Sequence, residues 1–185
     1  MQRDLVLRAQ RGDLDAFSAI AESCSSRLYA VAHLILRHED RASDAVQDAL
    51  LQAWIDIRGL RDPERFDAWI YRLLVRACYR AAGQHRRREI TEIDLGDWGG
   101  PVTPDAQRVI ALRDQIERGF ERLSREQRAV IVLHHYAGLT LAEAASVLGI
   151  PLGTMQSRLN RALLAMRAAL DADDRVPAYA AEAVR

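Results

Sequence analysis

Apolar residues recur at helical spacing along most of this 185-residue chain, and this period limits the fold more than any other feature. Leu28, Val31, Ala32 and Ile35 stand at positions i, i+3, i+4 and i+7, so a single helix face carries all four. The alternation of apolar and polar residues that marks a half-buried β-strand is not developed in any segment. The sequence therefore predicts an all-α protein.

The helical pattern falls into two groups. The segment between them, residues 89–107, contains five acidic residues and no arginine, together with glycines and prolines that interrupt helices. We therefore expect two small helical domains joined by a flexible acidic linker. The predicted helices span residues 4–11, 14–36, 40–58 and 63–87 in the first group and 125–136, 141–148 and 152–170 in the second. The predicted boundaries are residues 1–90 for the first domain, 91–106 for the linker, 107–172 for the second domain and 173–185 for a tail.

A helix-turn-helix is predicted in the second group. Ser124 and Thr140 each precede a glutamine or glutamate by three residues, which is the capping-box signature of a helix start. Gly149 suits the left-handed residue that ends a helix, and a tight turn there joins residues 141–148 to residues 152–170. The expected buried stripe of the last helix consists of Met155, Leu159, Leu163, Met166 and Leu170.

Polar and basic side chains occupy another face of that last helix, near its N-terminal end. Residues 144–170 include three arginines and no acidic residue. Side chains at this position of a recognition helix reach base edges and phosphates in a major groove. The alternative is an ordinary solvated helix face. The predicted DNA contacts are Thr154, Gln156, Ser157, Arg158 and Arg161.

The neutral net charge conceals an uneven distribution. The chain has 26 basic residues, all of them arginine, and 26 acidic residues. A total of zero argues against a nucleic-acid-binding protein. Six arginines and no acidic residue, however, fall within residues 72–88. The order of basic, acidic and basic segments therefore allows two DNA-binding regions separated by an acidic linker.

Motifs in both halves follow one another in a definite order. The first half contains DLVLRAQRGDLDAFSAIAE, RLYAVAHLIL, DAVQDALLQAW and RFDAWIYRLLVRA, and the second contains LSREQRAVIVLHHYAGLTLAEAASVLGIPLGTMQSRLNRALLAMR. Over residues 4–170 this order and spacing resembles the extracytoplasmic-function subfamily of bacterial RNA polymerase sigma factors. The resemblance implies a promoter-specificity subunit that binds core polymerase and recognises −35 and −10 promoter elements. The predicted helix-turn-helix would then bind the −35 element.

The segment DAVQDALLQAW resembles the part of the family that docks on the clamp helices of the polymerase. Four of its side chains share one helix face, because they stand at i, i+3, i+4 and i+7. A solvated helix face is again the alternative, and we expect Trp54 to belong to the core. The implied polymerase contacts are Asp44, Gln47, Asp48, Leu51 and Gln52.

The segment from Arg61 to Arg88 resembles the part that recognises and opens the −10 element. Three of its arginines repeat every four residues, which suits a face that follows a phosphate backbone. The loop at residues 60–65 would hold a base flipped out of the non-template strand, and two aromatic residues could stack on bases. The implied −10 contacts are Arg61, Arg65, Trp69, Tyr71, Arg72, Arg76 and Arg80, although Trp69 also suits a core position. Arg76 stands where family members commonly carry asparagine, so the base preference need not follow the family's.

The resemblance implies core RNA polymerase, promoter DNA and an anti-sigma factor as partners. No cofactor, metal, catalytic group or small-molecule substrate is expected. Cys24 and Cys78 lack metal-ligand spacing, and no apolar run reaches the length of a membrane span. The charged N-terminus does not look like a signal peptide. We therefore expect a cytoplasmic protein that is not an enzyme.

Two other functions stay open on the residues alone. A stand-alone helix-turn-helix regulator would account for the second half of the chain but leaves the DAVQDALLQAW segment without a purpose. A small helical enzyme would have to use His134 with His135, or His33 with His38. Adjacent histidines on a helix point about 100° apart, and no further group completes a catalytic site.

Overall fold

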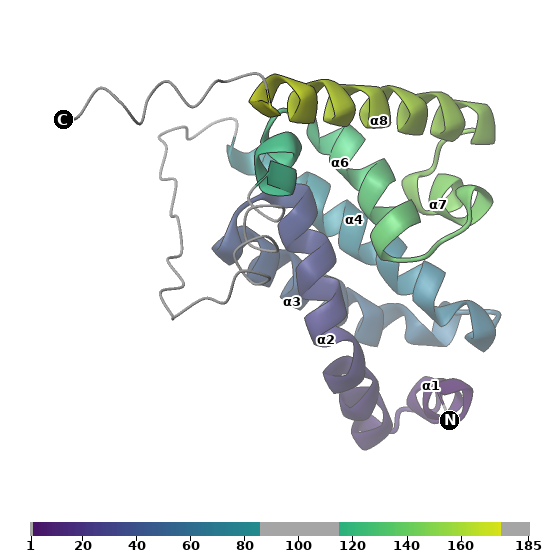
Figure 1. Cartoon of the computed structure of the whole chain (residues 1–185). Helices are drawn as coiled ribbons and strands as arrows, with labels where there is room; N and C mark the ends of the chain where they lie inside the picture. The colour runs from purple at the N-terminus through teal and green to yellow at the C-terminus, as the bar shows by residue number, and fades with distance from the viewer. Residues whose placement is uncertain (1, 86–114, 175–185) are drawn as a thin grey trace, which may run out of the picture.

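The computed structural model describes residues 2–85 and 115–174, and within these ranges it contains helices and turns but no strand (Figure 1). The all-α prediction is confirmed. The predicted linker and most of the predicted tail lie outside the described residues, so the domain boundaries stay predictions. In chain order the elements are α1 (Gln2–Gln10), α2 (Leu14–Leu36), α3 (Glu39–Asp56), η1 (Ile57–Gly59), η2 (Pro63–Arg65), α4 (Phe66–His85), a helical segment at 115–121, α6 (Arg125–Ile131), η3 (Val132–Tyr136), α7 (Leu141–Leu148) and α8 (Leu152–Asp174).

Helices α2, α3 and α4 pack against one another, and α1 packs on the N-terminal part of α2 (Figure 1). The predicted stripe of Leu28, Val31, Ala32 and Ile35 is fully buried between them. Burial of apolar area at this spacing is the main stabilising contribution to such a helix, since a short helix is marginal in water by itself.

Both predicted capping boxes are present. The Ser124 hydroxyl accepts a hydrogen bond from the backbone of Gln127 at 3.2 Å, and the Gln127 side chain accepts one from the backbone of Ser124 at 2.8 Å. Thr140 and Glu143 make the same reciprocal pair at the start of α7. Hydrogen bonds from the Thr140 side chain and backbone lower the pKa of Glu143. Each box satisfies two N–H groups that would otherwise lack a partner.

One predicted helix changes character near its end. The sequence predicts a regular helix over residues 125–136, but α6 ends at Ile131 and η3 is a single π-helical turn. The Ala137 N–H donates to the carbonyl of Val132 at 2.8 Å, five residues back. His134 Nδ1 lies 2.8 Å from the carbonyl oxygen of Leu139, which ties the turn to the residues that follow it. His134 thus has a structural contact, and the centre of its ring lies 4.7 Å from that of His135.

The two halves of the chain pack directly on each other. Helix α7 lies on α4, and α6 with η3 lies on α2, so one apolar core extends through both halves. Figure 1 shows α6 and α7 against the helices of the first half. Polar contacts cross the same boundary: Arg72 Nη2 donates to Ser146 Oγ at 2.9 Å, and the Arg125 guanidinium lies 5.1 Å from the centre of the Tyr79 ring. The two expected domains therefore pack against each other over a shared apolar core.

Arg128 holds this boundary from the inside. Its Nε donates to the carbonyl oxygen of Ile35 at 2.8 Å, where α2 nears its end. Its Nη1 donates to the carbonyl oxygens of Leu123 at 3.2 Å and Phe120 at 3.5 Å. Burial, followed by the neighbouring charges of Arg37 and Arg125, lowers the pKa of Arg128. One partly buried guanidinium thus donates hydrogen bonds to backbone carbonyls of both halves.

Replacing this side chain without changing its approximate volume tests its contribution. We expect Arg128→Met to lower the free energy of unfolding by about 2–4 kcal/mol, because three carbonyls lose a charged donor. Urea titration followed by circular dichroism measures the change. The exposed Arg167 of α8 gives the matched control Arg167→Met, which should change stability by less than about 0.5 kcal/mol. Equal losses in the two variants would contradict the assignment.

Candidate protein and nucleic-acid interfaces

The outer face of α3 carries most of the predicted polymerase contacts. Asp44, Gln47, Asp48 and Leu51 are exposed, while the alanines of the opposite face are buried against α2 and α4. Gln52 is partly buried and donates to Asp56 Oδ2 at 2.7 Å. The structure thus brings the predicted set together along one side of a single helix.

Ile55 belongs to the same face and was not predicted. Its side chain is 60% exposed, one turn beyond Leu51, which is 61% exposed. The signal was available, because Ile55 stands four residues after Leu51 and seven after Asp48. Trp54 instead points inward, with its ring 5.0 Å from that of Phe17, as expected for a core residue. The face therefore has an apolar pair, Leu51 and Ile55, beside carboxylates.

The three arginines spaced along α4 have different surroundings. Arg72 is partly buried and bonded to Ser146 of α7, whereas Arg76 is exposed. Arg80 Nη2 lies 3.7 Å from Asp48 Oδ2 on α3, which is an exposed and therefore weak ion pair. The structure does not leave all three side chains on one open surface, because α7 covers part of the row.

The two aromatic residues predicted to contact DNA are also partly covered. Trp69 is partly buried, with its ring 5.8 Å from that of Phe66. Tyr71 is only 1% exposed, and the Arg27 guanidinium lies 5.7 Å from the centre of its ring. Burial raises the pKa of Tyr71. In this arrangement no base can stack on Tyr71, contrary to the expectation from sequence.

A cleft of about 770 Å³ lies where the two halves meet. Its first wall is the segment from Leu60 to Arg72, and its second is formed by residues 137–146 at the start of α7. Arginines and carboxylates both line it, so the cleft does not carry a single sign of charge. Among the predicted −10 residues it contains Arg61, Arg65, Trp69, Tyr71 and Arg72.

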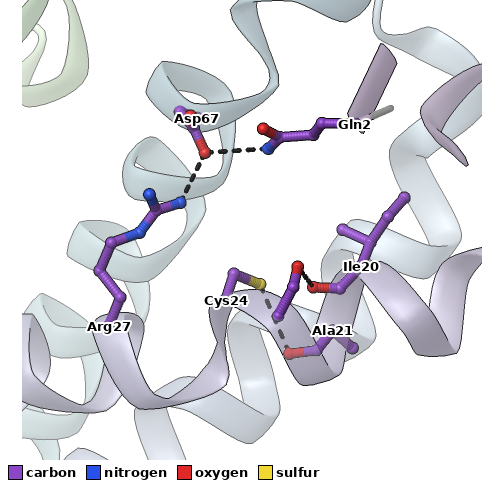
Figure 2. A network of polar contacts seen from close by, with 7 residues as sticks. Gln2, Ile20, Ala21, Cys24, Arg27 and Asp67 are labelled. Carbon is purple, nitrogen blue, oxygen red and sulfur yellow. Dashed lines mark hydrogen bonds and ion pairs between the residues drawn. The ribbon is translucent and has the colours of Figure 1, made fainter. Parts of the chain in front are cut away.

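Asp67 ties three helices together beside this cleft (Figure 2). Its Oδ1 accepts a hydrogen bond from Arg27 Nη2 of α2 at 2.6 Å and another from Gln2 Nε2 of α1 at 3.2 Å. Figure 2 also shows Cys24, whose thiol faces the carbonyl of Ala21 at 3.6 Å within α2. Cys24 is buried, and burial raises the pKa of its thiol. This network ties the first turn of α4, which follows the predicted −10 residues Arg61 and Arg65, to α1 and α2.

The helix-turn-helix is present with the predicted face outward. Gly149 adopts a left-handed conformation at φ 66°, and its N–H donates to the carbonyl of Ser146 at 3.3 Å. At the start of α8, Met155 and Leu159 are buried under the motif. The predicted contacts Gln156, Ser157 and Arg161 are exposed, and Thr154 and Arg158 are partly buried.

One residue of the predicted buried stripe of α8 is wrong. Leu163 is 41% exposed and Ala162 is completely buried, whereas Met166 and Leu170 are partly buried. The reason is the helical period of about 100° per residue. Leu163 is eight residues after Met155 and is therefore rotated about 80° from it around the helix axis, whereas Ala162 is seven residues after Met155 and is rotated only about 20° in the other direction. The inward side of α8 therefore continues through Ala162 and Met166, and Leu163 lies beside the exposed Leu164.

None of the helices formed by residues 2–85 and 115–174 combines the length and the apolar character of a membrane span. No group of three or more histidine, cysteine or acidic side chains there is arranged to hold a metal ion.

Family models match both halves of the chain. Residues 20–88 match Sigma-70 region 2, and residues 113–166 match Sigma-70 region 4. These matches coincide with the bundle of α2, α3 and α4 and with the helix-turn-helix half, respectively.

Curated relatives span nearly the same length. The ECF RNA polymerase sigma factor SigM of Mycobacterium tuberculosis is 31% identical over 156 residues, which cover 82% of this chain and 75% of the relative. SigW of Bacillus subtilis, another ECF sigma factor, is 25% identical over 178 residues, which cover 90% of this chain and 95% of the relative.

Two solved structures share the arrangement. CnrH in complex with the cytosolic domain of CnrY aligns with a TM-score of 0.67 and 27% identity, over 93% of this chain and 98% of that one. The sigma factor RpoE of Bartonella quintana, in complex with the anti-sigma factor NepR, has a similar fold, with a TM-score of 0.68 and 22% identity over 86% and 99% of the two chains. With region 2 in its first half, region 4 in its second and relatives of matching length, the chain belongs to the ECF RNA polymerase sigma factors.

Proposed function

We propose that each of the described surfaces carries out one binding function of a promoter-specificity subunit of RNA polymerase. The face of α3 binds core RNA polymerase, the loop at residues 60–65 with α4 recognises and opens the −10 element, and the start of α8 reads the −35 element. The protein contributes binding and strand separation in the cytoplasm, and it is not itself an enzyme. The observation that carries the proposal is the outward α3 face, which a stand-alone DNA-binding regulator would not need.

The composition of the α3 face supports a protein partner. Leu51 and Ile55 form a small apolar centre, and Asp44, Gln47 and Asp48 form a polar margin on one side of it. An apolar centre with a polar rim is the usual anatomy of a protein interface. The alanines on the buried side keep α3 close to α2 and α4, so the face is rigid before it meets a partner.

The start of α8 supports duplex recognition. Arg161 is exposed there, and its Nε donates to the carbonyl of Ser157 at 3.3 Å, so the guanidinium is already directed along the outer face. Gln156 and Ser157 lie beside it. An amide and a hydroxyl with arginines in the first turns of a recognition helix can contact base edges and phosphates.

The loop and α4 support contact with an unpaired strand. Arg61 and Arg65 are exposed at the edge of the cleft, and Trp69 lines it. A flipped base needs a pocket beside cationic groups that hold the backbone, and these residues provide both. Arg72 would join them once α7 no longer occupies its guanidinium.

The closed arrangement must open for both elements to be read together. A compact chain of this length measures about 40 Å across. The centres of the two promoter elements are about 25 base pairs apart, which at about 3.4 Å per base pair is about 85 Å. We therefore infer that the halves separate when the protein assembles with polymerase, which also uncovers Arg72. An anti-sigma factor, as in the RpoE complex, is the class of regulator that we propose for this chain.

The polymerase face can be tested with exposed residues alone. We expect the double variant Leu51→Ser and Ile55→Ser to bind reconstituted core polymerase about ten- to a hundredfold more weakly, because it loses the apolar centre of the interface. Fluorescence anisotropy of labelled protein gives the Kd, and run-off transcription gives the activity. Leu14 is also 61% exposed, at the start of α2, so Leu14→Ser is a matched control that should leave the Kd unchanged. Unchanged binding by the double variant would refute this surface.

The −35 surface can be tested on a promoter mapped by sequencing the transcripts that the holoenzyme starts. We expect Arg161→Ala to lower initiation about tenfold, because a contact to a base or phosphate is worth about 1–3 kcal/mol. The dependence of promoter binding on salt should also become shallower. Arg167→Ala, which removes an exposed arginine further along α8, is the control. If both variants lose the same activity, general charge attraction would explain the effect and sequence recognition would not.

Separation of the halves can be followed with two dyes. Arg37 lies 3.3 Å from Glu121 across the boundary, so dyes on Glu39→Cys and Glu121→Cys start close together. The native Cys24 and Cys78 are buried, and burial raises the pKa of Cys78 to about 12, so they should not react under native conditions. We expect high energy transfer in the free protein and a large decrease when core polymerase binds. The Leu51→Ser and Ile55→Ser background should keep the transfer high, and unchanged transfer in the otherwise native complex would contradict separation.

A further inference from the structure

The last side chain of helix α1 bonds to the base of the proposed strand-capture loop. Gln10, the last residue of α1, donates from Nε2 to the carbonyl oxygen of Leu60 at 2.7 Å and to that of Ile57 at 3.1 Å. An amide nitrogen carries two hydrogens, so one side chain can serve both carbonyls. The contact joins residues about 50 positions apart in sequence and is partly buried.

The two carbonyls lie at the inner end of the loop. The side chains of Ile57 and Leu60 are buried, and the Leu60 N–H closes the turn by donating to the Ile57 carbonyl at 3.1 Å. The next residues, Arg61 and Asp62, are exposed, and Asp62 Oδ1 accepts from the backbone of Glu64 at 3.1 Å. Gln10 therefore holds the point from which the exposed part of the loop begins.

Gln10 itself precedes an ordered turn between α1 and α2. Val6 and Ala9 bury α1 against the bundle, and Gly12 turns the chain with φ at 94°. Asp13 accepts from the backbone of Ala16 at 3.0 Å and pairs with Arg8 at 2.7 Å. The hydrogen bond from Ala16, followed by that from Arg8, lowers the pKa of Asp13. The backbone that carries the Gln10 side chain is thus ordered by the turn that follows it.

We propose that Gln10 is a positioning residue for strand capture, and this rests on the proposed role of the loop at residues 60–65. By holding the carbonyls of Ile57 and Leu60, it keeps the loop in the shape that accepts an unpaired base. The ion pair of Arg3 with Glu64 at 3.3 Å also joins α1 to the loop, but it is highly exposed and contributes little. Gln10 does not have to touch DNA for this role.

The substitutions separate the donor from the shape of the side chain. Gln10→Glu keeps the shape but places a carboxylate, which only accepts hydrogen bonds, against two carbonyl oxygens. Gln10→Asn shortens the side chain by one methylene and provides a second loss of contact should the first variant fold poorly. Gln10→Lys restores a donor and should rescue. Gln2→Leu, which releases α1 from Asp67 without touching the loop, is the matched control.

The experiment measures binding of a fluorescent non-template strand by the reconstituted holoenzyme. The strand covers the −10 element of a promoter mapped as above, and single abasic sites are stepped through it. We expect the native holoenzyme to lose affinity when the captured base is missing. Gln10→Glu and Gln10→Asn should bind the intact strand about three- to tenfold more weakly, which is the range for a lost hydrogen bond. They should lose little more at the abasic site, whereas Gln10→Lys should respond like the native protein.

The outcomes distinguish the positioning role of Gln10 from the strand capture on which it rests. If Gln10→Glu and Gln10→Asn lose as much affinity at the abasic site as the native holoenzyme does, Gln10 does not position the loop, although strand capture stands. If the native holoenzyme is indifferent to every abasic site, strand capture itself fails, and the role of Gln10 fails with it. Core polymerase affinity should be the same in all variants, and a parallel loss there would also overturn the proposal.

Discussion

The packing of the second half against the first is the constraint on which the rest of the structure depends. Apolar residues of α2 and α4 meet those of α6, η3 and α7 in one core, and Arg128 serves carbonyls on both sides. The same contact engages Arg72, yet it leaves the outer faces of α3 and α8 exposed. The proposed polymerase and −35 surfaces are thus available in the free protein, while part of the proposed −10 surface is not.

The sequence predicted helices best where local chemistry marks their ends. Helices α2 and α7 have the predicted bounds, Leu14–Leu36 and Leu141–Leu148, and each begins at a side-chain cap. Period alone was less reliable. It placed Leu163 in the core, where a correct count of rotation places Ala162, and it could not show the π-turn at η3, which depends on hydrogen bonds beyond the regular helical register. On α3 the polar face was predicted, but its apolar continuation at Ile55 was overlooked.

The contact between the halves could not be predicted from sequence for a different reason. Its polar part uses residues such as Arg72 and Arg128, whose composition suits solvent or DNA as well as it suits a buried carbonyl. The contacts of Gln10 could not be predicted from the sequence either, because its partners are backbone atoms of residues far along the chain. Side chains that bond to backbone leave no pairing signal in a single sequence, so only the fold shows what they hold.

The apolar core shared by the halves also sets the concentration of polymerase that the protein needs. If the protein assembles with polymerase on a promoter only in the open form, the apparent Kd of that assembly is its intrinsic Kd divided by the fraction of molecules that are open. Each 1.4 kcal/mol of closure therefore weakens the apparent affinity about tenfold. Residues such as Ser146, which bonds to Arg72 across the boundary and is not itself a proposed contact of polymerase or DNA, could then adjust the threshold of the transcriptional response without altering which promoters are read.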